Sequence, residues 1–338
     1  MQPADASSSI VSDHDAHGTA HGERLTTRLV YGAMALGGSW DGADLTDQEF
    51  AHGFAALSAA HDAGFRVIDL ADIYTAGKSE SVVGQWLAEN PVRPELTLQT
   101  KAGIRLPGNT APEDAPVHYR LDRATLRDGL EGSLARLGVD AVDRFLIHRW
   151  DPLVDVAEVG TVLDELVEEG LTRGIGVSNV SWYRLDLLQR HLHHPVEVVQ
   201  SQLSLGHRDF VERQILWDHP DGTAVDFSEE LLDEAAASGV EIQAWGALDQ
   251  GRYTREPQDS ADSATADLVR QIATDLRCSP EAVVLAWIMR LPQRVRPVIG
   301  SADPGRIRAC AEADRALAVL TYEHWYALLN SARGRNIP

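Results

Sequence analysis

The chain has 338 residues, 44% of them hydrophobic, and its 30 basic side chains stand against 51 acidic ones, for a formal net charge of −21. This acidic excess repels the phosphates of nucleic acids and the anionic surfaces of lipid bilayers, so we expect neither a nucleic acid nor a membrane as a partner. An anionic cofactor would have to be held by a local cluster of backbone N–H groups and a few basic side chains.

Cysteine usage and the absence of targeting features indicate a cytoplasmic protein. The only cysteines are Cys278 and Cys310, and their spacing matches neither a disulfide framework nor a zinc knuckle, which fits a reducing compartment. No apolar run approaches the length needed to cross a bilayer. Residues 1–24 lack the basic and apolar regions of a secretory signal.

Composition divides the chain into a tail and one large domain. Residues 1–24 are rich in Ser, Asp, His, Ala and Gly, which predicts a disordered tail. Its histidines could in principle bind a metal, but composition favours a solvated segment, and we expect no metal site. Although 338 residues would fit two average domains, α/β barrels of this length form one, so we expect a single domain over residues 25–338.

From Phe65 onward, short apolar runs alternate with amphipathic stretches, which is typical of βαβ units in a parallel sheet. Seven strands are predicted, at 66–70, 96–100, 144–147, 174–178, 196–202, 240–245 and 296–300. An eighth could be short and hidden in the polar stretch between Leu248 and Asp267. Upstream, the run from Leu29 to Leu36 predicts an arm of a β-hairpin that closes the floor of a barrel.

The predicted helices carry their own start signals. Asp122, Ser181 and Ser228 can each cap a helix, and Ser279-Pro280 and Asp303-Pro304 place proline at a first helical position. An open dinucleotide-binding sheet would be expected to show G-x-G-x-x-G after its first strand, where this chain reads Ala71-Asp72-Ile73-Tyr74. We therefore predict a (β/α)8 TIM barrel, whose chemistry sits at the carboxyl ends of its strands.

Four ionisable residues occur at or just after three successive strand ends: Asp69 and Tyr74, then Lys101, then His148. A tyrosine with its usual pKa of about 10 is a poor proton donor, and it needs a nearby cation and a carboxylate that positions the cation. Taken singly, each residue is better explained as a cap, a rim aromatic, a surface cation or a buried histidine. Their ordered coincidence favours catalysis.

The segments that carry these residues resemble the aldo-keto reductases. The matching motifs are Ile68 to Tyr74, Gln99-Thr100-Lys101, Leu146 to Pro152 and Gly174 to Asn179, and the resemblance runs from about Leu29 to Leu320. The His-Arg-x-Asp-Pro run and Asp221-Gly222-Thr223 resemble a bacterial branch of broad-substrate oxidoreductases. The resemblance implies NAD(P)H-dependent reduction of an aldehyde or ketone, a small-molecule carbonyl substrate, on the predicted barrel.

The resemblance also assigns catalytic roles. Tyr74 would protonate the carbonyl oxygen as hydride arrives, and Lys101 would lower the pKa of the phenol by placing a positive charge beside it. Asp69 would pair with Lys101 and hold it in place. His148 would donate a hydrogen bond to the same substrate oxygen.

For the cofactor, the resemblance implies that Ser178, Asn179 and Gln202 bind the nicotinamide carboxamide and that Trp245 stacks on the nicotinamide ring. Gly246, which stands where the family frequently has serine, and Leu248 belong to the same site. Gly300, Ser301 and Arg306 would hold the adenosine phosphate near a helix N-terminus. Arg306 and Ser301 favour NADPH, whereas NADH is possible because Ala302-Asp303 replaces the expected basic residue.

The sequence also offers candidates for the lining of a substrate pocket. Trp40, Trp150 and His207 could line an apolar pocket, since they lie in loops or near strand ends.

The string Gly176 to Val180 lacks the last glycine of the serine-hydrolase motif, and the strand ends offer no second metal ligand at a suitable spacing from His148. The serious alternative is a regulatory or redox-sensing subunit that binds the nucleotide on the same fold.

Overall fold

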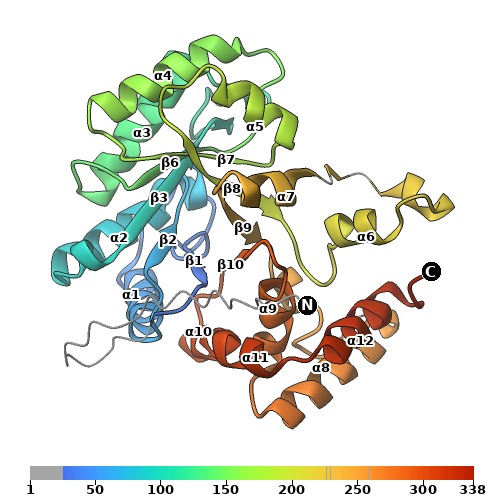
Figure 1. Cartoon of the computed structure of the whole chain (residues 1–338). Helices are drawn as coiled ribbons and strands as arrows, with labels where there is room; N and C mark the ends of the chain where they lie inside the picture. Colours follow the sequence, from blue (N-terminus) through green and yellow to red (C-terminus); the bar gives the residue numbers. More distant parts are fainter. Residues whose placement is uncertain (1–25, 226, 229, 258) are drawn as a thin grey trace, which may run out of the picture.

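The computed structural model describes residues 26–225, 227–228, 230–257 and 259–338. The predicted disordered tail and its histidines lie outside these residues. Eight parallel strands close into a barrel in the order β1-β10-β9-β8-β7-β6-β3-β2, which confirms the (β/α)8 prediction (Figure 1). The barrel strands are β1 (Val30–Gly32), β2 (Val67–Asp69), β3 (Thr97–Ala102), β6 (Arg144–Ile147), β7 (Ile175–Ser178), β8 (Val196–Gln202), β9 (Glu241–Trp245) and β10 (Arg296–Ile299).

The eighth strand differs from the sequence-based expectation. The run from Leu29 to Leu36 is not a hairpin arm, because β1 within it pairs in parallel with β10 on one side and with β2 on the other. The stretch 248–267 contains two 3-10 turns, Asp249–Gly251 and Ser260–Asp262, before the next helix begins. A two-stranded antiparallel sheet, β4 (Ile104–Arg105) with β5 (His118–Tyr119), follows β3 instead.

Helices surround the barrel, and several begin at predicted caps. The side chains of Asp122, Ser181, Ser279 and Asp303 each accept a hydrogen bond from a backbone N–H in the first turn of their helices. The helices are α1 (Asp47–Asp62), α2 (Lys78–Glu89), α3 (Arg123–Leu137), α4 (Val156–Glu168), α5 (Trp182–Gln189), α6 (Asp209–Ile215), α7 (Glu230–Ala237), α8 (Ser263–Leu276), α9 (Pro280–Met289), α10 (Pro304–Ala311), α11 (Ala313–Val319) and α12 (Tyr322–Arg333).

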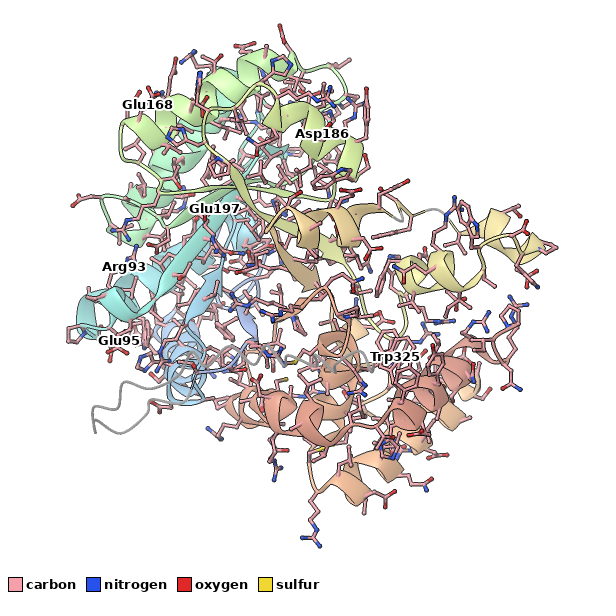
Figure 2. The ribbon with its side chains drawn as sticks, in the orientation of Figure 1. Arg93, Glu95, Glu168, Asp186, Glu197 and Trp325 are labelled. Atoms are coloured by element: carbon pink, nitrogen blue, oxygen red, sulfur yellow. The ribbon has the colours of Figure 1, made fainter. Side chains whose placement is uncertain are left out.

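The apolar core lies between the strands and these helices. Trp287 on α9 is fully buried and stacks on Trp325 of α12 with ring centres 5.1 Å apart. Each indole N–H donates to the backbone carbonyl of the other tryptophan, which satisfies both polar groups inside the core. Charged side chains such as Glu168 project from the outer helices (Figure 2). Among the described helices, none is long and apolar enough to span a membrane.

Candidate active site

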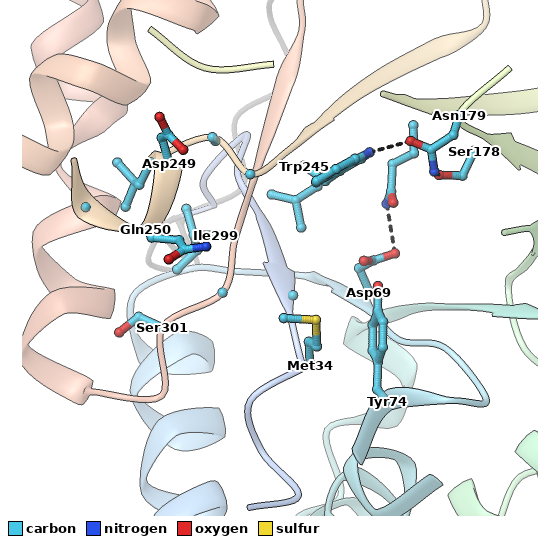
Figure 3. Close-up of a pocket in the computed structure, with 18 of the residues that line it drawn as sticks. Met34, Asp69, Tyr74, Ser178, Asn179, Trp245, Asp249, Gln250, Ile299 and Ser301 are labelled. Atoms are coloured by element: carbon cyan, nitrogen blue, oxygen red, sulfur yellow. Dashed lines mark hydrogen bonds between the residues drawn. The ribbon is translucent and has the colours of Figure 1, made fainter. Parts of the chain in front are cut away.

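A cavity of about 540 Å³ opens at the carboxyl ends of the strands (Figure 3). Most of the predicted site residues line it, and they come from the last residues of β2, β7 and β9 and from the segments after β1, β2, β6, β7, β9 and β10. These residues are Trp40, Asp69, Tyr74, His148, Ser178, Asn179, Trp245, Gly246, Leu248, Gly300, Ser301 and Arg306. The volume and the mixture of aromatic, apolar and a few polar groups are typical of a small-molecule site.

The loop after β2 holds Tyr74 in a strained backbone. Asp69 is the last residue of β2, and the residues directly after the tyrosine, Thr75 and Ala76, have φ values of 48° and 60°. Left-handed conformations are unfavourable for residues other than glycine, so such strain commonly marks a functional site. The buried Thr75 hydroxyl stabilises the turn through Ser79 Oγ at 2.9 Å. The strained turn fixes the direction of the phenol.

Lys101, at the carboxyl-terminal part of β3, lies fully buried behind Tyr74. Its Nζ donates to Asp69 at 2.8 Å, to the carbonyl of Leu70 at 2.7 Å and to the Tyr74 hydroxyl at 3.1 Å. An ammonium group has three N–H donors and cannot accept. The Tyr74 oxygen must therefore accept from Lys101, which leaves its own hydrogen available for a group in the cavity.

The resemblance implied that Lys101 would lower the pKa of Tyr74, but the structure gives a different result. Burial raises the pKa of Tyr74, and the nearby charge of Lys101 opposes this effect only partly, so the net shift is upward rather than downward. Burial acts to lower the pKa of Lys101, but Asp69 and Tyr74 outweigh it, and the net shift is again upward. The phenol and the ammonium are therefore both protonated at neutral pH.

His148 follows β6, and its ring meets the Tyr74 ring edge to face, with centres 5.8 Å apart. Burial, Lys101 and Arg149 together hold the pKa of His148 well below its usual value, so the imidazole is neutral. Its Nδ1 is buried and has no hydrogen-bond partner in the described part of the chain. The other ring nitrogen, Nε2, is therefore the one that can face a substrate oxygen.

The wall beyond His148 is a connected set of polar side chains around an indole. Trp245 donates through Nε1 to Asn179 Oδ1 at 2.9 Å, and Asn179 Nδ2 donates to Ser178 Oγ at 2.7 Å. Gly246, the next residue after Trp245, has a φ of 68°, which explains a glycine at this point. Gln202, predicted for the same cluster, does not line the cavity. Gln200, two residues earlier on β8, takes this place.

Arg255 and Arg306 also line the cavity, together with Gly300 and Ser301. Arg255 lies in the polar segment before α8 and was not anticipated from the sequence. Arg306 Nη2 lies 3.6 Å from Glu281 Oε1, so part of its charge is already balanced. Asp303 caps α10 by accepting from the backbone N–H of Arg306 at 2.8 Å, and it does not line the cavity.

The structure places the three residues predicted for a substrate pocket differently with respect to the cavity. Trp40 lines the cavity mouth and is 53% exposed. Trp150 instead lies under the guanidinium of Arg184, 5.4 Å from the ring centre, and His207 closes a tight turn with Ser204. Neither residue lines the cavity, whereas Met34 and Arg149, which the sequence did not single out, do.

A closed parallel barrel that brings a tyrosine, a lysine, an aspartate and a histidine together beside one cavity at the carboxyl ends of its strands has the architecture of a TIM-barrel enzyme. The model of the aldo/keto reductase family matches residues 28–327, and the chain belongs to this family. The expectation of an aldo-keto reductase, an oxidoreductase, is thereby confirmed.

Several relatives with curated names are bacterial oxidoreductases, as expected. The chain is 34% identical to a 6-dehydroglucose reductase of Novosphingobium aromaticivorans, with 83% of this chain and 86% of the relative covered. It is 30% identical to a 6-dehydroglucose reductase of Agrobacterium fabrum, over 92% of this chain and 96% of that protein. Oxidoreductase YdhF of Escherichia coli is 32% identical over 82% of this chain and 86% of its own length.

Solved structures agree in fold. A glycerol dehydrogenase from Gluconobacter oxydans superposes with a TM-score of 0.74 at 25% identity, covering 93% of this chain and 94% of the other. An aldo-keto reductase from Klebsiella pneumoniae, solved with NADPH, superposes with a TM-score of 0.68 at 23% identity, covering 93% of this chain and 92% of that one. This second likeness supports the barrel alone.

Proposed function

We propose that the protein reduces an aldehyde or ketone to the alcohol with NADPH as the hydride donor and Tyr74 as the general acid. The observation that carries this proposal is the arrangement of donors at the phenol. Lys101 Nζ donates a hydrogen bond to the Tyr74 oxygen at 3.1 Å. The phenolic hydrogen of Tyr74 is therefore left to face the cavity. A proton donor aimed at an enclosed cavity is what carbonyl reduction requires.

The residues around the cavity suit a nicotinamide dinucleotide. Trp245 provides a flat apolar wall, and Ser178, Asn179 and Gln200 provide hydroxyl and amide groups that suit a carboxamide. Arg306 and Arg255 provide the positive charge that phosphates need. When bound, NADPH supplies the hydride.

The protein's own groups then handle the proton and the developing charge. As the carbonyl oxygen gains negative charge, Tyr74 transfers its hydrogen to that oxygen, and Lys101 stabilises the resulting phenolate. Neutral His148 donates from Nε2 to the same oxygen and orients the carbonyl. Asp69 accepts from Lys101 at 2.8 Å and keeps the ammonium in place throughout.

A polyhydroxylated aldehyde is a reasoned first substrate. Two relatives are named as 6-dehydroglucose reductases. In this chain, Arg149 lines the cavity, and its guanidinium, 5.9 Å from the ring centre of Trp245, carries several N–H donors that suit hydroxyl oxygens. We therefore propose that the substrate combines a carbonyl group with oxygen acceptors. A panel of carbonyl compounds, run with NADPH and with NADH, tests both substrate and cofactor.

The test of function is NADPH consumption with 4-nitrobenzaldehyde, an activated aldehyde, by the wild type and by Tyr74→Phe. We expect turnover by the wild type and a loss of at least about a thousandfold in Tyr74→Phe, since the variant lacks the acid, with the dissociation constant for NADPH nearly unchanged. Tight nucleotide binding without turnover by the wild type would favour the regulatory or sensing subunit. Retained turnover in Tyr74→Phe would show that another group is the acid.

A further inference from the structure

Three glutamines meet inside the barrel, where apolar side chains usually fill the space. Gln99 comes from β3, Gln200 from β8 and Gln243 from β9, and their exposed fractions are 0%, 2% and 0%. Buried amides are costly unless every donor and acceptor is paired. The hydrogen-bond partners of these three amide groups therefore have to be identified. The proposed mechanism does not use Gln99 or Gln243.

The glutamine amides form one hydrogen-bonded cluster against Asp69. Gln99 Nε2 donates to Asp69 Oδ1 at 2.6 Å and to Gln243 Oε1 at 2.7 Å. Gln200 Nε2 donates to Asp69 Oδ1 and to Gln243 Oε1, both at 2.8 Å. The side-chain oxygen of Gln243 thus accepts from both of the NH₂ groups that donate to Asp69, and it holds both of them in place.

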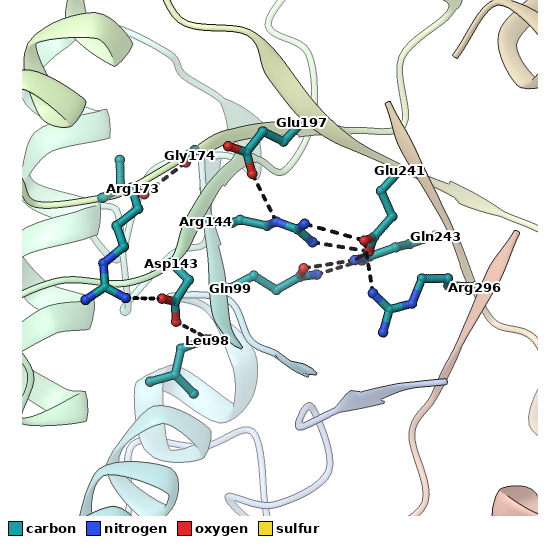
Figure 4. Close-up of polar contacts among 11 residues, drawn as sticks. Leu98, Gln99, Asp143, Arg144, Arg173, Gly174, Glu197, Glu241, Gln243 and Arg296 are labelled. Atoms are coloured by element: carbon teal, nitrogen blue, oxygen red, sulfur yellow. Dashed lines mark hydrogen bonds and ion pairs between the residues drawn. The ribbon is translucent and has the colours of Figure 1, made fainter. Parts of the chain in front are cut away.

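The far side of the cluster ends at a second carboxylate. Gln243 Nε2 donates to Gln99 Oε1 at 3.0 Å and to Glu241 Oε1 at 2.7 Å. Glu241 is held by Arg144 Nη1 at 3.2 Å and by Arg296 Nη1 at 2.9 Å (Figure 4). Burial raises the pKa of Glu241, but the two arginines outweigh it and the net shift is downward.

The two carboxylates fix the direction of every amide between them. An ionised carboxylate only accepts hydrogen bonds, so Gln99 and Gln200 must turn their NH₂ groups toward Asp69. For the same reason, Gln243 must turn its NH₂ group toward Glu241, which leaves its oxygen facing the other two glutamines. No other set of amide orientations satisfies all of these contacts.

We propose that Gln243 is a positioning residue for the reduction. Through Gln99 and Gln200 it holds the Asp69 carboxylate in the orientation that presents both oxygens to Lys101, whose Nζ lies 2.8 Å from each. Lys101 in turn sets the Tyr74 phenol. Gln243 does not line the cavity, so its effect reaches the substrate only through this series of contacts. The inference rests on the proposed roles of Asp69, Lys101 and Tyr74.

The activity test compares Gln243→Met, which removes the amide at similar volume, with Gln243→Glu. In a protonated carboxyl group an oxygen can still accept from Gln99 and Gln200, and an O–H can replace the N–H toward Glu241. Burial between two carboxylates keeps the introduced group protonated at pH 6. We expect Gln243→Met to lower kcat about tenfold with the KM for NADPH within about twofold, and Gln243→Glu to restore most of kcat at pH 6.

A second measurement does not depend on turnover. Lys78 and Lys101 are the only lysines in the chain, so a sample labelled with ¹³C at lysine Cε gives two signals, which Lys78→Arg assigns. We expect Gln243→Met to shift the Lys101 signal while the Lys78 signal stays unchanged. If Gln243→Met fails to fold, Gln243→Asn, which keeps an amide on a shorter side chain, is expected to show the same shift and loss of kcat.

Thr265→Val is the matched structural control. Thr265 is 1% exposed and its hydroxyl contacts Ser331 Oγ at 2.8 Å between α8 and α12, so the variant loses a buried hydrogen bond away from Asp69. We expect it to lower stability without changing kcat or the Lys101 signal. Wild-type kcat and an unchanged Lys101 signal in Gln243→Met and Gln243→Asn would overturn the inference, and so would equal effects in Thr265→Val. An inactive wild type would count against the proposed function instead, and the Lys101 signal would still decide the inference.

Discussion

Replacing Lys101 by methionine tests the electrostatic basis of the site most directly. The Nζ atom lies 3.1 Å from the Tyr74 oxygen, and with an effective dielectric constant of about 20 two unit charges at this distance interact by about 5 kcal/mol. In a transition state where the phenol has lost about half of its proton, removing the ammonium costs about half of this energy. Each 1.36 kcal/mol is about tenfold in rate, so we expect kcat to fall about a hundredfold.

The assay is NADPH consumption with a saturating activated aldehyde, together with nucleotide binding measured by fluorescence. Lys78→Met is the matched control, because Lys78 is the other lysine of the chain and forms a peripheral ion pair with Asp41 at 3.4 Å. We expect Lys78→Met to keep wild-type turnover. A folded Lys101→Met enzyme with kcat within about threefold of the wild type would refute the assignment of Lys101 as the electrostatic support of the acid.

Two further predictions concern the cofactor and the pH dependence of stability. Asp303→Lys should raise the affinity for NADPH relative to NADH about tenfold, since a cation replaces an anion near the adenosine phosphate. Asp303→Asn is the control, because it removes the charge but keeps the helix cap. If Asp303→Lys leaves the preference for NADPH over NADH unchanged, Asp303 serves only as the helix cap. Burial, then the charge of Glu80, raises the pKa of Asp72 to about 7, so the folded state binds a proton that the unfolded state releases near pH 4. Stability therefore falls as pH rises from about 4 to about 7, by up to about 4 kcal/mol, and Asp72→Asn should remove this fall in urea unfolding at pH 5 and pH 8. Parallel pH profiles of the wild type and Asp72→Asn would contradict this.

Local patterns predicted most of the barrel. The seven anticipated strands are present with small shifts at their ends, because apolar runs bounded by helix caps are strong signals. The run that holds β1 was predicted to be extended, but it was assigned to a hairpin arm instead of the barrel. Its partners are β2 and the last strand of the chain, and pairing between segments so distant leaves no mark on a local pattern.

The proposed catalytic residues could be selected from the sequence because chemistry restricts both residue type and position at a strand end. The sequence could not decide whether Gln200 or Gln202 lines the cavity, since both side chains lie on the same face of β8 and only their depth in the barrel separates them. Arg255 belongs to a loop, and loop conformation is not written in a residue pattern. The upward pKa shift of Tyr74 depends on burial, which becomes known only once the surrounding chain is placed.

The closure of the ring by β1 has a consequence for biosynthesis. The Tyr31 hydroxyl donates to the backbone carbonyl of Ser301, 270 residues away in the sequence, at 3.1 Å. These two segments are neighbouring strands of the barrel, and residues from both line the cavity, so the ribosome must synthesise the chain as far as β10 before this part of the cavity exists. Contacts of such long range form late and slowly. A nascent chain that has not yet reached β10 therefore has an unclosed sheet, and the site can form only after β10 has been made.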